Sequence, residues 1–247
     1  MRPGMKKMIF SLAIAVAAGA NTLAQTSDPQ PSTDEVVAKM MEADAVRQSH
    51  MAGYTAFQVY IAVNGKRRAE MRVRVDCSFD GVKQFTVLSE DGSGSIRKHV
   101  FSKMLREQGD ASRGEARENS RITPANYEFR MVGQETLESG PAYVLAISPK
   151  NDSKYLMAAR IWVDAQDYSI VRIEGRPARN PSFWVHDVHF VHTYQRVGSF
   201  WLAFTTESTS EVRIFGPSKL TIESSDYVLH PPPQQSLEPV SIASVMR

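Results

Sequence analysis

The chain has 247 residues, of which 42% are hydrophobic and 23% are charged, and its formal net charge is +2. This is the composition of a globular protein with a buried core, and so small a net charge lacks the basic footprint of a nucleic-acid-binding protein. The single cysteine, Cys77, excludes an internal disulfide framework. We expect a buried, inert thiol there, because free cysteine is among the most buried residue types.

The N-terminal segment has the order of a secretory signal peptide: a basic start, "MRPGMKKM", an apolar run, "IFSLAIAVAAGA", and an A-x-A-like site ending at Ala24. The run is shorter than the ~20 residues that span a bilayer, and an uncleaved membrane anchor is the alternative. We predict a signal peptide over residues 1–24, cleaved after about Ala24 or, alternatively, Ala20, and export to the periplasm. Its removal lowers the net charge from +2 to −1, because three basic residues and no acids are lost.

Residues 25–33 are polar and contain prolines, which predicts a linker. A helix should follow over roughly residues 34–51, with its N-cap between Ser32 and Asp34. The apolar positions of this segment recur at helical spacing: Val36, Val37, Met40, Met41, Ala45 and Val46.

Beyond this helix, apolar residues alternate with a period of about 2, which is typical of strands. The turn signals Asn64–Gly65 and Asp80–Gly81 divide the next stretch into three antiparallel strands. A short helix is expected near Met104 and Leu105, inside a connector that is otherwise a polar, solvated loop.

From Asn126 onward about seven further strands alternate with turns, with no helix between them. This order predicts an antiparallel sheet in an α+β fold. A sheet of about ten strands curls or closes, and its helices must cover one face. We place the domain at residues 34–230 and predict that residues 231–247, which open with prolines, are a tail.

The segment "FWVHDVHFVHTY" holds His186, His189 and His192 at a spacing of three. Its β-branched and aromatic composition predicts a strand, in which side chains alternate between faces. His186 and His192 should then share a face with Trp184, Phe190 and Tyr194, while His189 points to the other face. The two histidines on one face would be roughly 20 Å apart at ~3.3 Å per residue, too far to hold one metal ion.

The sequence carries no nucleophile elbow of the G-x-S-x-G type and no phosphate-binding loop. We therefore predict no catalytic residue, no metal site and no cofactor. A metal-dependent hydrolase that uses the three histidines is a further hypothesis.

The distinctive residues are apolar and lie on both the helix and the strands. A curved sheet with a helix across its mouth can enclose an apolar cavity, in which flexible methionines suit adaptable binding. Ordinary core packing is the alternative explanation. The candidate cavity residues are Met40 and Met41 on the helix, and Phe57, Trp184, Phe190 and Phe204 on strands.

Three stretches together resemble the LolA-like superfamily, the bacterial outer-membrane lipoprotein-sorting proteins: "ITPANYEFRMVGQETLESGPAYVLAISPK", "RIWVDAQDYSIVRIEGRPARNPSFW" and "GSFWLAFTTESTSEVRIFGPSKLTIESSDYVL". The resemblance covers roughly residues 34–229. It implies a strongly curved, incomplete antiparallel β-barrel with helices as a lid. It also implies a non-enzymatic carrier of acyl chains across the periplasm.

The first functional hypothesis is therefore a periplasmic carrier of lipoprotein acyl chains or other lipids, monomeric and in contact with envelope membrane proteins. The alternative is an envelope binding or sensing module that meets another protein and carries no ligand. Such a module needs an exposed apolar edge or patch instead of a cavity.

Overall fold

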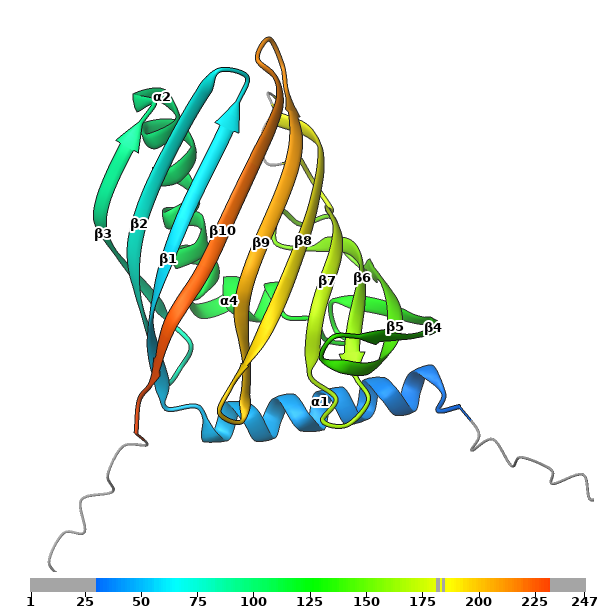
Figure 1. Cartoon of the computed structure of the whole chain (residues 1–247). Coiled ribbons are helices and arrows are strands. Elements are labelled where there is room, and N and C mark those ends of the chain that lie inside the picture. Colours follow the sequence, from blue (N-terminus) through cyan, green and yellow to red (C-terminus); the bar gives the residue numbers. More distant parts are fainter. Residues whose placement is uncertain (1–29, 181–182, 184, 232–247) are drawn as a thin grey trace, which may run out of the picture. The chain divides into compact units, whose positions relative to one another are not determined.

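A computed structural model of the chain describes residues 30–180, 183 and 185–231, in which one large sheet is joined to several helices (Figure 1). The elements in chain order are α1 (Thr33–His50), β1 (Gly53–Asn64), β2 (Arg67–Ser78), β3 (Lys83–Gly92), α2 (Gly94–Ile96), the π-helix η1 (Arg97–Phe101), α3 (Ser102–Ala111), α4 (Gly114–Ser120), β4 (Tyr127–Leu137), β5 (Gly140–Pro149), β6 (Met157–Asp164), β7 (Ile170–Pro177), β8 (Val185–Val197), β9 (Phe200–Val212) and β10 (Gly216–Leu229).

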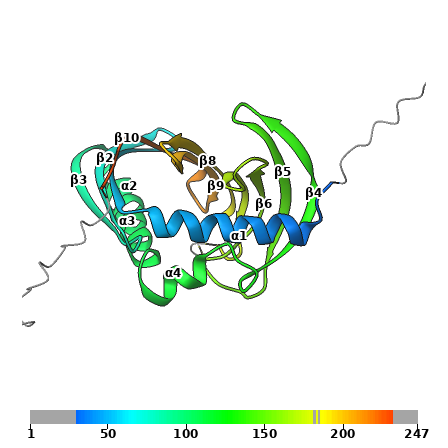
Figure 2. The ribbon, with the colours of Figure 1, turned by 90° about the horizontal axis from the view of Figure 1, so that it is seen from below.

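In the described part of the chain, the sheet has ten antiparallel strands in the order β3-β2-β1-β10-β9-β8-β7-β6-β5-β4, so that β3 and β4 form its two edges. It curls without closing, and α1 crosses the mouth of the curve, while α2 and α3 of the insert lie on its concave side and α4 lies at its open side (Figure 2). The predicted α+β fold, with an open curved sheet, an N-terminal helix and a helical insert, is confirmed. The predicted signal peptide and most of the predicted linker and tail lie outside the described residues.

Helix α1 begins at Thr33 because Ser32 caps it. The Ser32 hydroxyl accepts a hydrogen bond from the Glu35 N–H, and the Glu35 carboxylate accepts one from the Ser32 N–H, which is a capping box. The observed helix, Thr33–His50, agrees with the predicted one to within a residue at each end. In the described part of the chain, no helix is both long and apolar enough to cross a bilayer.

Both predicted hairpin turns are present. Gly65 between β1 and β2 and Gly81 between β2 and β3 have positive φ angles of 57° and 79°, which glycine adopts without strain. Unlike the hairpins, the pairing of β1 with β10 is long-range: it joins residues more than 150 positions apart, such as Tyr60 and Ile222. It makes the N-terminal meander and the later strands one continuous sheet.

Two apolar clusters lie on the concave face. The α1 cluster joins Val36, Val37 and Met40 of α1 to Tyr127, Leu145, Ile147, Leu156, Ile161, Val163, Ile173 and Phe190. The insert cluster joins Ile96 and Phe101 of the insert to Tyr60, Ala62, Ala69, Met71, Val73, Val75 and Ile222. Helix α1 and the first part of the insert, α2 with η1, are therefore fixed by burial of their own apolar side chains against different parts of the same face.

Polar contacts on the flank of α1 add to this packing. Lys39 donates a hydrogen bond to the Tyr168 hydroxyl at 3.1 Å, and Arg47 donates one to the Ser169 hydroxyl, both in the β6–β7 turn. Asp44 accepts from Arg121, which follows α4, at 3.0 Å. Helix α1 is thus tied both to the sheet and to the insert.

Gly175 in β7 is required by close packing against β6. A β-carbon built on it would lie 2.4 Å from the Ala158 carbonyl oxygen and 2.6 Å from the Ala159 β-carbon. We expect Gly175→Ala to lower the free energy of unfolding by about 1–3 kcal/mol, because the strands must move apart. Urea denaturation measures the change. Gly133→Ala is the matched control, since a β-carbon there meets nothing within 4 Å, and equal losses in both variants would contradict the argument.

Candidate ligand cavity

One row of directly opposed residues runs across the concave face. It follows the strand register from Tyr60 through Ile222, Thr206, His192, Ile173 and Ile161 to Leu145. Opposed residues in neighbouring strands point to the same face. The row is apolar on both sides, where the two clusters lie, and polar only at its centre, at Thr206 and His192.

A cavity of about 460 Å³ opens beside this centre, between the insert and the sheet. Its volume falls within the ~300–1,000 Å³ of small-molecule sites. It is lined by Met104, Glu107, Gln108 and Ala111 of α3, Ser120 of α4, Lys154 and Tyr155 of the β5–β6 connection, Pro177 and Arg179 at the end of β7, and His192 of β8. The cavity lies between the clusters, because Met104 packs on the insert cluster and Phe190 of the α1 cluster adjoins His192.

Helix α3 is held in place by a partly buried chain of polar side chains. Gln108 donates a hydrogen bond to the Tyr60 hydroxyl at 3.2 Å, and that hydroxyl donates to the Gln58 side chain at 2.8 Å. Burial raises the pKa of Tyr60 to about 12, so its hydroxyl stays protonated. At the end of α3, the Ser112 hydroxyl accepts from the Lys83 N–H at 3.0 Å. The wall of the cavity is therefore anchored to β1 and to β3.

His192 is the polar group in the floor of the cavity. Its Nδ1 lies 2.8 Å from the Thr206 hydroxyl, and its ring lies 4.7 Å from that of Phe190, centroid to centroid. Burial lowers the pKa of His192 to about 4, so the ring is neutral at neutral pH. Among the described residues its Nε2 has no hydrogen-bond partner, which leaves this nitrogen available to a ligand.

The prediction that His186 and His192 share a face of their strand, with His189 on the other face, is wrong. His186 pairs with Glu211 and His189 pairs with Thr209, so these two histidines share a face, and His192 is on the other with Phe190. The cause is a β-bulge at Asp187, whose φ angle is 51°. An extra residue in the strand reverses the alternation beyond it.

His186 and His189 contact acids on the outer face. The nearest atoms are His186 Nδ1 and Asp187 Oδ2, at 2.8 Å, and His189 Nε2 and Glu174 Oε1, at 3.5 Å. Across the residues that the structure describes, no group of three or more histidine, cysteine, aspartate or glutamate side chains is placed to hold a metal ion.

The structure brings three of the six candidate cavity residues together. Met40, Met41 and Phe190 all belong to the α1 cluster or pack against it. Phe57 lies opposite Arg74, on the face of β1 that Tyr60 does not use, and Phe204 lies at a register shift in β9; their exposed fractions are 36% and 47%. Trp184 lies outside the described residues.

The insert residues of the cavity were missed in the sequence, because their segment was predicted to be mainly a polar loop. The structure instead has three consecutive helical elements from Gly94 to Ala111. The signal was present as helical spacing: Phe101 is followed at steps of three or four residues by the pair Met104 and Leu105, then by Gln108, and then by Ser112. Because Gln108 and Ser112 are polar, the pattern of apolar residues alone does not indicate this helical stripe.

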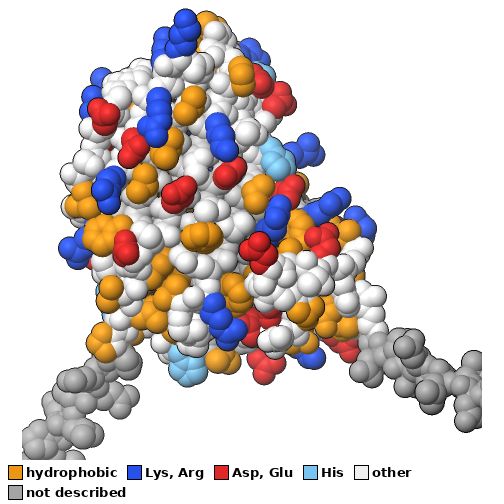
Figure 3. Space-filling model, viewed as in Figure 1, with side chains coloured by type: hydrophobic (Ala, Val, Ile, Leu, Met, Phe, Trp, Pro, Cys, Tyr) orange, Lys and Arg blue, Asp and Glu red, His pale blue; other side chains and the backbone are white. Residues whose placement is uncertain are grey.

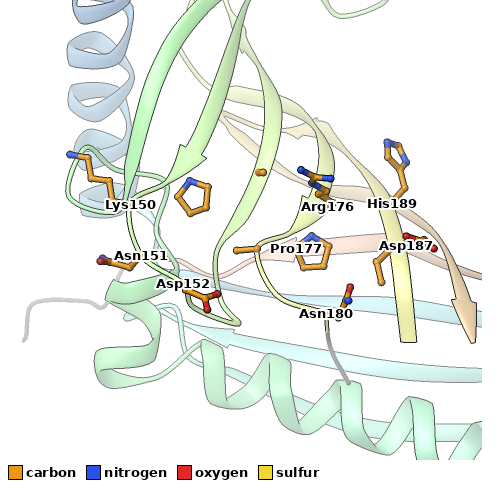
Figure 4. Close-up of a pocket in the computed structure, with 12 residues that line it drawn as sticks. Lys150, Asn151, Asp152, Arg176, Pro177, Asn180, Asp187 and His189 are labelled. Atoms are coloured by element: carbon orange, nitrogen blue, oxygen red, sulfur yellow. The ribbon is translucent and has the colours of Figure 1, made fainter. Parts of the chain in front are cut away.

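A larger, open hollow of about 760 Å³ lies on the outer face at the ends of β5 to β8 (Figure 4). Lys150, Arg176 and His189 line it together with Asp152 and Asp187, so its charges are mixed. The rest of this face is also mixed: basic and acidic side chains alternate over it (Figure 3), and many are paired, as Lys219 is with Glu207.

The fold is that of an open, curved antiparallel sheet with helices on its concave side. No protein-family model matches the sequence, and neither does any curated protein. Similar solved structures include a putative outer membrane lipoprotein-sorting protein domain from Vibrio parahaemolyticus, with 16% identity, 83% of this chain and 95% of that chain covered, and a TM-score of 0.44.

Two more similar structures are a DUF1329 family protein from Desulfovibrio piger (12% identity, 81% and 94% covered, TM-score 0.43) and a LolA superfamily protein from Nitrosomonas europaea (11% identity, 83% and 96% covered, TM-score 0.41). The family that the sequence resembles is thus represented among the similar structures. At these values the likeness is distant and does not define a function.

Proposed function

We propose that the protein is an exported periplasmic carrier that binds an acyl chain of a lipoprotein or another lipid in the cavity between the insert and the sheet. The observation that carries this proposal is the 460 Å³ space left between two apolar clusters. A soluble carrier must hide the chain from water, and each buried methylene contributes about 0.8 kcal/mol. The signal-peptide prediction and the sequence resemblance support the periplasmic assignment. No catalytic step is part of this function.

The cavity can be filled by mutation. Ala111→Trp places a large side chain in its wall, and we expect at least a tenfold loss of affinity for a fluorescent fatty acid. Ala45→Trp, at an exposed position of α1, is the matched control and should bind as the wild type does. Circular dichroism melts of both variants exclude unfolding as the cause.

Native mass spectrometry of protein purified from a bacterial periplasm tests whether a natural ligand co-purifies with it. We expect a bound lipid or acylated peptide. Recovery of no lipid, together with no fatty-acid uptake by the wild type, would reject the carrier function.

The edge strand β3 favours a second candidate function, an envelope module that binds another protein. Val87 and Leu88 of β3 are 46% and 51% exposed, and an edge strand presents unpaired backbone groups that can pair with another chain. Pull-down from an envelope extract distinguishes the two functions, because Leu88→Lys should abolish capture by this edge and leave fatty-acid binding intact.

A further inference from the structure

We propose that the cavity selects an amphiphile with one alkyl chain and an anionic head group, a carboxylate or a phosphate, held by Lys154 and Arg179. This inference rests on the proposed function and narrows it to one ligand class. It departs from the carriage of a multiply acylated lipoprotein, because it limits both the number of chains and the charge of the ligand.

The volume limits the number of chains. A space of about 460 Å³ holds about 15 groups of the size of a water molecule, at ~30 Å³ each. A methylene group is close to that size. One long alkyl chain therefore matches the volume of the cavity, and two chains of that length would exceed it.

Two cations line the cavity from neighbouring segments of the sheet side. Lys154 lies in the β5–β6 connection and Arg179 follows β7, while Met104 and Ala111 of α3 form the apolar wall. A chain against α3 would therefore have a cationic partner for its head group on the sheet side. Guanidinium groups bind carboxylates and phosphates through two parallel hydrogen bonds.

Among the residues that the structure describes, neither cation has a strong partner. Arg179 Nε lies 3.6 Å from Asp152 Oδ1, in an ion pair whose side chains are 59% and 75% exposed. Such a surface pair is worth about 0–1 kcal/mol, so a ligand anion can replace the aspartate. The Lys154 ammonium lies over the Tyr155 ring, 4.8 Å from its centroid, and within the described residues it forms no ion pair.

The other ionisable side chains of the lining do not prevent an anion from binding. Among the described lining residues the one acid is Glu107, and it is paired with Lys103 at 3.7 Å. His192 adds a neutral ring nitrogen in the floor, suited to a hydrogen bond with an uncharged oxygen of the ligand. The lining therefore carries a net positive charge around an apolar space.

The test measures displacement of the neutral fluorophore N-phenylnaphthylamine from the full-length mature protein. The competitors share a dodecyl chain and differ in the head: dodecanoate, dodecyl phosphate, dodecanol and dodecyltrimethylammonium. Acetate and inorganic phosphate serve as heads without a chain. We expect the two anionic amphiphiles to bind at least tenfold more tightly than dodecanol, and the cationic one to bind most weakly.

Reversal of both charges, Lys154→Glu with Arg179→Glu, should remove the preference for anions and leave dodecanol binding unchanged. Lys66→Glu with Arg176→Glu makes the same change in net charge at exposed positions outside the cavity and should keep the preference. The ratio of dodecanoate to dodecyl phosphate affinity then separates a fatty-acid carrier from a carrier of single-chain phospholipids.

Three results would overturn the inference. Equal binding of anionic and neutral amphiphiles would remove the head-group selection and leave the carrier function standing. Competition by acetate or phosphate alone would make the cavity a simple anion site. Failure of every amphiphile to displace the fluorophore would overturn both this inference and the proposed function.

Discussion

Replacing Phe101 by alanine is expected to lower the free energy of unfolding by about 3–5 kcal/mol, the usual cost of removing a buried phenyl ring. Phe101 ends the π-helix η1 and is fully buried in the insert cluster. Its ring meets that of Tyr60 edge to face, with 6.0 Å between centroids, a geometry that adds to the value of the burial. The variant should therefore loosen the attachment of the insert to the sheet.

We expect the Phe101 variant to destabilise the insert locally, in addition to lowering the global free energy of unfolding. Hydrogen exchange should accelerate most in α3, which forms one wall of the cavity, and least in β5 to β7 beneath α1. Urea denaturation measures the global change. Phe79→Ala is the matched control, because Phe79 is 72% exposed and its loss should cost little. A comparable loss in both variants would show that Phe101 does not anchor the insert.

Acidification is expected to destabilise the protein through His192. Its folded-state pKa is lowered from 6.5 to about 4 by burial, so between these two values the unfolded chain binds a proton that the folded chain does not. Stability therefore falls as the pH drops through this window, and the full loss from this group is reached below pH 4. The shift corresponds to about 3 kcal/mol.

His192→Asn removes the titrating group and keeps a side chain that can hydrogen-bond Thr206. In urea denaturation between pH 4 and pH 7, the variant should have a shallower pH dependence than the wild type. His99→Asn, at an exposed position of the insert region, is the control and should keep the wild-type slope. A variant at His192 with an unchanged slope would contradict burial as the cause.

Local patterns were sufficient to predict most of the secondary structure. The helix at Thr33–His50 follows from its apolar spacing and from Ser32, and the hairpins follow from Gly65 and Gly81, because these signals act between residues close in the chain. The insert was the exception. Its stripe includes Gln108, whose amide N–H donates a hydrogen bond to Tyr60, a residue 48 positions away, and hydrophobicity along the chain does not reveal such a partner.

The cavity required the tertiary structure. Of the six residues proposed from the sequence, Met40, Met41 and Phe190 meet in one cluster, while Lys154, Arg179 and Gln108 were not foreseen. Lys154, Arg179 and Gln108 line one cavity only because the sheet curls and the insert folds back onto its concave face. Such neighbours are distant in sequence, and no local propensity brings them together.

The histidine segment shows which of its features the sequence determined and which the tertiary structure decided. By its composition alone the sequence determined that this segment is a strand, because β-branched and aromatic side chains favour a pleated surface. Only the tertiary structure decided which face each histidine occupies, because the bulge at Asp187 depends on how β8 pairs with β9. The same pairing sets His192 against Thr206 at the centre of the concave face, where the row of opposed residues turns from apolar to polar.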